Sequence, residues 1–251
     1  MSDLSGTHAI VTGAGQGVGR GIALALAKAG ANVAVVGRTL EKCQNTVAEI
    51  EAAGGRAIAL SCDVGHRDEV ESTVQQVFQL FGSIHILVNN AHTSRPLVSM
   101  VDTSDRDLAI AFKGYYGAVY MMQACYPHLQ ASRGSVINLG SVAGLRGDHG
   151  MMAYASAKEA LRAMSRTAAR EWGPQGIRVN VVCPFSESPG VQYMIDTHPG
   201  FIDELTEQTA LKQLGRSEQD VGATVVFLCS DGGRFMTGQT LHVDGGIWIA
   251  P

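Results

Sequence analysis

Short apolar runs alternate along the chain with longer segments of helical periodicity, the pattern of stacked strand–helix–strand units. The runs are rich in Val, Ile and Ala and stay apolar at successive positions, as expected of strands covered by helices on both sides. Strands are predicted at His8–Thr12, Asn32–Val36, Ala57–Leu60, Ile84–Val88, Ser135–Leu139, Val179–Val182 and Leu241–Val243. Helices are predicted near Val18–Ala29, Leu40–Ala53, Asp68–Phe81, Ser104–Leu129, Tyr154–Trp172 and Gln219–Leu228, the last entered by a capping box at Ser217–Asp220. The pattern therefore predicts an α/β fold with a doubly wound parallel sheet of seven strands.

One segment interrupts this alternation. Prolines and Gly200 break the helical period across residues 185–214, and helical content is expected to be weak there. A long irregular segment after the carboxyl end of a strand is more often a functional lid than a spacer. Because no linker or repeat occurs elsewhere, residues 1–251 are predicted to form a single domain, with a substrate lid at about 185–214.

Composition and charge exclude several classes of partner. The chain is 45% hydrophobic and 17% charged, as in ordinary globular proteins, and its net charge is −4 without a basic run. A surface with this charge does not favour the binding of nucleic acid. No apolar run approaches a membrane span, and the N-terminal sequence does not resemble a signal peptide. We expect a soluble protein with neither nucleic acid nor membrane as a partner.

The cysteines indicate the compartment. There are five, an odd number, widely spaced and without a C-x-x-C pair or the spacing of metal ligands. Unpaired thiols of this kind fit a reducing cytoplasm. A cytoplasmic location and the absence of a metal site are therefore expected.

A glycine-rich turn follows the first predicted strand. Its spacing is G-x-x-x-G-x-G, from Gly13, Gly17 and Gly19, whereas the generic G-x-G-x-x-G fingerprint fails. Glycines let the backbone approach a pyrophosphate whose charge is met by the start of the next helix. A turn without a ligand is the alternative, but the position at the first strand-to-helix junction favours a dinucleotide, with Gln16 and Val18 also in contact with it.

The second strand ends in Gly37-Arg38, where an acid would bind the ribose hydroxyls of NAD and a base would meet the 2′-phosphate of NADP. The first acid is Glu41, and Lys42 adds positive charge one helical turn after Arg38. NADP(H) is favoured and NAD(H) stays possible, because the alternative role for Arg38 is to cap a solvated loop and Gln16 supplies no second base in the phosphate turn.

Tyr154 and Lys158 open the fifth predicted helix at a spacing that places both on one face. A free tyrosine titrates near ~10, and a neighbouring cation favours the phenolate. Lowering that pKa to ~7 needs roughly 4 kcal/mol, which Lys158 and an oxidised nicotinamide could share. The spacing by itself occurs by chance in many helices.

Further motifs accompany this pair. Ser141 follows the fifth strand, Asn89-Asn90-Ala91 follows the fourth, and Thr237–Gln239 and Val243–Gly246 lie near the C-terminus. With the glycine turn and Tyr154–Lys158, these motifs resemble the short-chain dehydrogenase/reductase family over essentially the whole chain.

The resemblance implies a Rossmann-type fold, an often tetrameric assembly and a small carbonyl or alcohol substrate; a homotetramer or homodimer is expected. It implies that Ser141 polarises the substrate oxygen, Tyr154 transfers the proton and Lys158 binds the nicotinamide ribose. The positions that it assigns to the cofactor are Asp63, Val64, Asn89, Ala91, Tyr154, Lys158 and Pro184.

The chain departs from the family pattern at four positions. Gly114 stands where the family has an asparagine that holds a water of the proton relay. His92 and Phe185 replace glycines beside the cofactor, and Pro189 replaces a threonine that contacts the carboxamide. The two rings either reshape the pocket or point away and pack, and His92 is the better functional candidate because it titrates.

His149 and Tyr193 complete the substrate candidates, together with His92 and Phe185. The leading hypothesis is an NADP(H)-dependent oxidoreductase that transfers a hydride between nicotinamide and a carbonyl or alcohol, with Tyr154 as acid and base. Two alternatives stay open. One is a dinucleotide-binding sensor or subunit with weak or no hydride transfer, and the other is a reductase of an imine or activated alkene.

Overall fold

The computed structural model describes residues 3–93, 95, 97–198 and 200–249 and contains the predicted parallel sheet. The sheet has seven strands in the order β3-β2-β1-β4-β5-β6-β7. Its strands are β1 His8–Thr12, β2 Asn32–Gly37, β3 Arg56–Ser61, β4 Ile86–Asn89, β5 Ser135–Leu139, β6 Arg178–Pro184 and β7 Thr240–Val243. The fold class is confirmed, and the bounds differ from the prediction by no more than two residues at either end.

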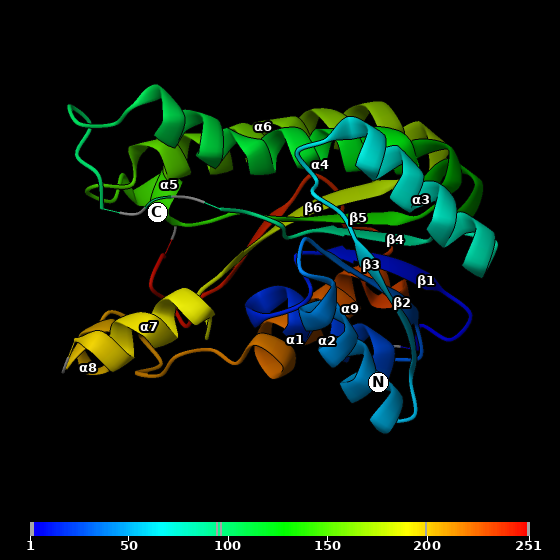
Figure 1. The fold of residues 1–251 in the computed structure, drawn as a ribbon, viewed down its shortest axis with the longest axis horizontal. Helices are drawn as coiled ribbons and strands as arrows, with labels where there is room; N and C mark the ends of the chain where they lie inside the picture. Colours follow the sequence, from blue (N-terminus) through cyan, green and yellow to red (C-terminus); the bar gives the residue numbers. More distant parts are fainter. Residues whose placement is uncertain (1–2, 94, 96, 199, 250–251) are drawn as a thin grey trace.

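Helices cover both faces of this sheet, as the uninterrupted apolar strands predict. In Figure 1, α3, α4 and α6 lie over one face, and α1, α2 and α9 lie over the other. The α-helices are α1 Gly17–Lys28, α2 Leu40–Ala52, α3 Arg67–Phe81, α4 Asp105–Ser132, α5 Ala143–Arg146, α6 Met152–Trp172, α7 Pro189–Thr197, α8 Phe201–Glu207 and α9 Ala223–Cys229. Short 3-10 turns occupy Gly173–Gln175 and Asp231–Gly233.

The core is divided into two layers by the sheet. Along β1, Ile10 packs in the cluster that contains residues of α3 and α4, whereas Val11 packs in the cluster that contains residues of α1 and α9. Consecutive strand side chains point to opposite faces, so both neighbours are fully buried. Strands buried in this way hold the loops at their carboxyl ends in fixed positions.

Those loops meet where the strand order reverses. β1 pairs with β2 on one side and with β4 on the other, so the chain runs outward in both directions from the β1–β4 pair. Open α/β sheets bind ligands outside the strand ends at such a switch point. The glycine turn after β1 and the Asn89–Ala91 turn after β4 therefore share one edge of the molecule.

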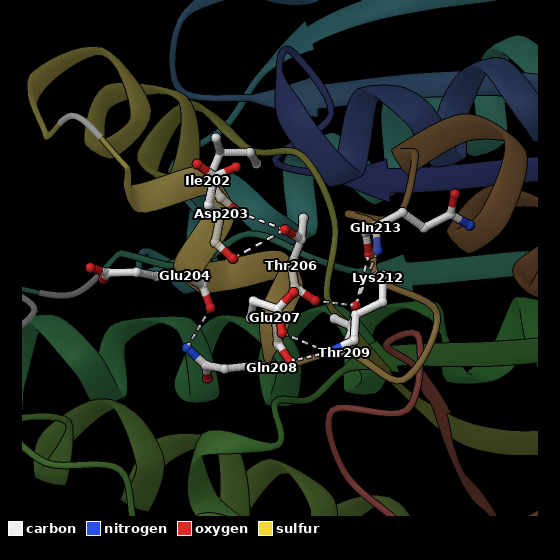
Figure 2. Close-up of polar contacts among 9 residues, drawn as sticks. All are labelled: Ile202, Asp203, Glu204, Thr206, Glu207, Gln208, Thr209, Lys212 and Gln213. Carbon is white, nitrogen blue, oxygen red and sulfur yellow. Dashed lines mark hydrogen bonds and ion pairs between the residues drawn. The ribbon is translucent and has the colours of Figure 1, made fainter.

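The expectation of weak helical content across residues 185–214 is wrong, because the segment forms α7 and α8. Pro189 is the first residue of α7, where a missing N–H costs nothing, and Gly200 precedes α8 at φ 86°. Hydrogen bonds within α8 and the turn after it hold this part together (Figure 2). Thr209 Oγ1, for example, donates to Thr206 O at 2.9 Å, and Lys212 Nζ donates to Glu207 O at 2.8 Å.

The predicted capping box at Ser217 is also absent from the structure. Ser217–Gly222 forms a π-helical turn that leads into α9, and the side chain of Ser217 donates to Glu187 O at 2.8 Å. The Asp220 carboxylate instead accepts from the backbone N–H of Arg216 at 2.6 Å. The Ser217 hydroxyl, which the local spacing predicts to cap the helix, thus donates its hydrogen bond to a residue 30 positions away in the sequence.

The described residues contain neither a membrane-spanning helix nor a metal-binding cluster. None of their helices is long and apolar enough to cross a membrane. Within the same residues, no group of three or more His, Cys, Asp or Glu side chains is arranged to hold a metal ion.

Candidate active site

The glycine turn after β1 is shaped for close backbone approach. Gly13 and Gly17 adopt left-handed backbone angles, with φ values of 63° and 56°. A side chain at Gly13 would place its Cβ 2.9 Å from Ala91 Cα, and one at Gly19 would overlap the Asn90 amide and Gly13 O. Glycine is therefore required at positions 13 and 17 for the backbone conformation and at position 19 for space.

Thr12 and Asn90 fasten this turn to the turn after β4. Asn90 Nδ2 donates to Thr12 O at 3.0 Å and to Gly13 O at 3.1 Å. The backbone N–H groups of Asn90 and Ala91 donate to Thr12 Oγ1 at 3.0 and 3.1 Å. Sequence reasoning gave neither side chain a site role, although both lie inside the motifs that it used.

A cleft of about 390 Å³ lies over these turns, a volume typical of ligand sites. The predicted cofactor residues that line it are Gly13, Gln16, Gly17, Val18, Arg38, Asp63, Val64 and Ala91. Gly19 and Pro184 are not among its lining residues, whereas Asn89 and Lys158 line a second, smaller cavity. The cleft fits a dinucleotide, because the start of α1 borders it through Gln16, Gly17 and Val18, and the N–H groups at a helix N-terminus bind phosphate.

Charged side chains border the cleft. Lys42 Nζ donates to Gln16 Oε1 at 2.6 Å, and Arg38 donates to Thr93 Oγ1 at 3.3 Å. Lys113, which sequence reasoning missed, forms an ion pair with Asp63 at 2.6 Å. Partial burial raises the pKa of Asp63, but the hydrogen bonds from Lys113 and the Gly65 N–H, together with the charges of Lys113 and Arg38, outweigh burial, so this pKa lies below its usual value. Asp63 is therefore an anion at neutral pH.

The first turns of α6 carry Tyr154 and Lys158, and the end of β5 holds their partners. The Ser141 hydroxyl, which follows β5, lies near enough to the Tyr154 hydroxyl to oppose the effect of burial on its pKa. Lys158 is buried and its Nζ donates to Leu139 O at 2.7 Å. That Nζ lies 5.7 Å from the centre of the Tyr154 ring. The structure thus brings together the three side chains predicted to be catalytic.

Burial dominates the proton affinities of this pair. It raises the pKa of Tyr154 above its usual value, against the opposing effect of the hydrogen bond with Ser141. Burial also lowers the pKa of Lys158 to about 8. Desolvation disfavours the charged form of both groups. The lowering of the Tyr154 pKa by Lys158 together with an oxidised nicotinamide stays a prediction.

Replacing Lys158 by Met is expected to stabilise the fold at neutral pH. The folded pKa of about 8 lies below the usual 10.5, so the unfolded chain binds more protons between these values. Native Lys158 therefore destabilises the fold most below pH ~8, and this penalty disappears as the pH rises to ~10.5. The stability gain of Lys158→Met should be about 3 kcal/mol larger at pH 7 than at pH 10.5, measured by urea unfolding. A pH-independent gain would contradict this prediction.

His92 occupies the space that Gly114 leaves on α4. A side chain at Gly114 would place its Cβ 2.7 Å from His92 Nδ1. The imidazole stands edge-to-face on the Tyr154 ring, with centroids 4.9 Å apart. Burial, and secondly the charge of Lys158, lowers the pKa of His92 to about 3, so the ring is neutral. Of the two rings that replace family glycines, this one points into the site.

The remaining substrate candidates lie farther out. Phe185 is half-buried, and its backbone N–H donates to Val243 O at 2.9 Å, but it lines neither cavity. His149 is exposed on the loop after α5. Tyr193 belongs to α7, and its side chain lies outside the described part of the structure. Ser188, near the family's carboxamide position, does line the larger cleft.

The fold and the site together define a class of protein: a doubly wound nucleotide-binding enzyme with a tyrosine–lysine pair beside its dinucleotide cleft. Residues 13–248 match the family model described as enoyl-(acyl carrier protein) reductase. The chain belongs to the short-chain dehydrogenase/reductase family and is an NAD(P)-dependent oxidoreductase.

Three relatives support this assignment. A 12alpha-hydroxysteroid dehydrogenase of a Clostridium species is 38% identical over 260 residues and aligns over 100% of both chains. The 3-oxoacyl-(acyl-carrier-protein) reductase FabG of Staphylococcus epidermidis is 37% identical, covering 96% of this chain and 98% of its own. A crystal structure of a Sinorhizobium meliloti protein assigned as a short-chain alcohol dehydrogenase has a TM-score of 0.91 and 33% identity, covering 98% of this chain and 97% of the other.

Proposed function

We propose that this protein is an NADP(H)-dependent oxidoreductase that transfers a hydride between nicotinamide and a carbonyl or alcohol of a small to medium, fairly apolar substrate. The observation that carries the proposal is the convergence of Ser141, Tyr154 and Lys158 at the end of β5. When bound, the nicotinamide supplies or accepts the hydride.

The side chains of the chain handle the proton. Tyr154 Oη gives its proton to the substrate oxygen during reduction and takes it back during oxidation, while Ser141 orients that oxygen by a hydrogen bond. The charge of Lys158 favours the phenolate form of Tyr154.

The preference for NADP(H) rests on Arg38 and Lys42. Both line the cleft at the carboxyl end of β2, where a 2′-phosphate would lie. A guanidinium binds phosphate through paired, charge-assisted hydrogen bonds.

Arg38→Ala is expected to weaken NADP⁺ binding by about tenfold to a hundredfold, because it removes hydrogen bonds to a charged group. NAD⁺ has no 2′-phosphate, so its affinity should change little. Calorimetric Kd values for the two nucleotides test this, with Arg170→Ala, an exposed arginine of α6, as the matched control. Equal losses for both nucleotides would show that Arg38 only supports the loop.

The substrate class is tested by following nicotinamide absorbance with a panel. It contains hydroxysteroids, 3-oxoacyl thioesters, simple ketones, an imine and an enoyl thioester, since the relatives are named for the first two groups and the matching family model for enoyl reduction. Turnover of ketones or alcohols, lost in Tyr154→Phe, is expected. Turnover of the imine or alkene alone would favour the alternative reductase. Cofactor binding without any turnover would favour a sensor or subunit.

The proposed lid spans residues 185–214, including α7 and α8. Its two ends meet, because Ser186 and Gly215 form a bridge and Glu187 N donates to Gly215 O at 3.0 Å. A segment closed at its base in this way can move as a unit, and Ser188 places its start at the cleft.

We also propose a cytoplasmic homodimer or homotetramer. All five cysteines are free thiols, which suits a reducing compartment. The side chain of Phe235 is 100% exposed, and Tyr116 on α4 is 51% exposed, so apolar surface is available for a second copy. Light scattering coupled to size-exclusion chromatography would measure the mass.

A further inference from the structure

A small cavity lies behind the Tyr154–Lys158 pair, between β4, α4 and α6. Its volume is about 10 Å³, enough for one water molecule. The polar residues on its wall are Asn89, His92, Tyr115 and Lys158. It shares Ala91, His92 and Gly114 with the dinucleotide cleft, so the two spaces adjoin.

Two polar atoms of residues on this cavity wall are buried and have no hydrogen-bond partner among the described residues: His92 Nε2 and Asn89 Oδ1. An unsatisfied buried polar atom costs about 1–3 kcal/mol, and two beside one cavity indicate a shared partner. Sites that hold buried water offer polar groups of this kind.

A chain of hydrogen bonds fixes the direction of the Asn89 amide. Ser165 Oγ gives its proton to Leu161 O at 2.7 Å, so it must accept from Asn138 Nδ2 at 2.8 Å. Asn138 Oδ1 is then left to accept from Asn89 Nδ2, also at 2.8 Å. The amide nitrogen of Asn89 is thereby committed, and its oxygen is the atom left without a partner.

We propose that His92 Nε2 and Asn89 Oδ1 bind one water molecule in this cavity, and that this water accepts a hydrogen bond from Lys158 Nζ. The inference rests on the proposed function, in which Lys158 favours the phenolate of Tyr154. The water donates both of its protons, one to Asn89 and one to the neutral imidazole, which then carries its own proton on Nδ1. Its lone pairs are free for an N–H of Lys158, which uses one of three with Leu139 O.

His92 is therefore a positioning residue that acts through the water. A second acceptor for the Lys158 ammonium favours its charged form and, through that charge, the phenolate of Tyr154. The titratable groups around the imidazole are Lys158 and Tyr154 from α6 and Tyr115 from α4. The low pKa of His92 keeps its acceptor available throughout the working range of pH.

The test combines crystallography with titration of the variants His92→Phe and His92→Gln. Phenylalanine keeps a ring against Tyr154 without an acceptor, and glutamine restores one. In a crystal structure that resolves waters, wild type and His92→Gln should show density between residue 92 and Asn89, and His92→Phe should not. His128→Phe, on α4 against Phe78, is the matched control.

The phenolate absorbance of Tyr154, taken as the difference from Tyr154→Phe, reports the coupling without turnover. The pKa of Tyr154 should rise by about one unit in His92→Phe and return to the wild-type value in His92→Gln. The pH of half-maximal alcohol oxidation should shift in the same way in both variants. A dry wild-type cavity, or an unchanged Tyr154 titration in His92→Phe, would overturn the inference. An inactive wild type that retains both the water and the pKa shift would overturn the proposed function instead.

Discussion

Tyr154→Phe should lower kcat/KM by about 10²- to 10⁴-fold, the usual contribution of a positioned acid or base. The variant removes the hydroxyl that lies beside the Ser141 side chain and keeps the ring that packs edge-to-face on His92 at 4.9 Å. The fold and the cleft should therefore survive. Steady-state rates with the best substrate of the panel test the loss of kcat/KM, and the Kd of NADP⁺ tests whether the cleft is intact.

Tyr126→Phe is the matched control for this loss. Tyr126 lies in α4 and packs with a tilted ring against Trp172 at the far end of α6, with centroids 5.1 Å apart. Removal of the Tyr126 hydroxyl should leave kcat/KM unchanged. If Tyr154→Phe retained the wild-type rate, the proton would have to come from another group and the proposed role of Tyr154 would be wrong.

Gly19→Ala should destabilise the protein by about 3 kcal/mol, combining an overpacked contact with broken hydrogen bonds. The added Cβ would overlap Asn90 Nδ2 and Gly13 O. That amide fastens the turns after β1 and β4, through bonds of 3.0 and 3.1 Å. Because the same turns form the floor of the cleft, the affinity for either nucleotide should fall with stability. Urea unfolding and calorimetry measure the two effects.

Gly173→Ala is the control that adds the same methyl group at a glycine where it meets no neighbouring atom. Gly173 has a negative φ of −55°, and nothing lies within 4 Å of a Cβ built on it. That variant should behave as wild type. Equal stability of the two variants would mean that Asn90 can move away without cost, and that the glycine spacing does not constrain the turn.

Residues near one another in sequence made the main features predictable. Each strand is an apolar run, and consecutive residues such as Ile10 and Val11 bury themselves on opposite faces, so the parallel sheet follows from local pattern. The sequence pattern does not predict α7 and α8, because Pro189 and Gly200 interrupt the helical period. In the structure they stand at helix starts, where both residues are compatible with a helix.

The sequence by itself determined the fold class, the glycine turn and the spacing of Tyr154 and Lys158 on one helix. Tertiary structure decided what surrounds them: the lowered pKa of Lys158, the imidazole of His92 over Gly114, and the direction of the Asn89 amide. A local pattern records propensity and periodicity. Burial and hydrogen-bond partners depend on which distant segments the sheet brings together, as Ser165, Asn138 and Asn89 come together from α6, β5 and β4.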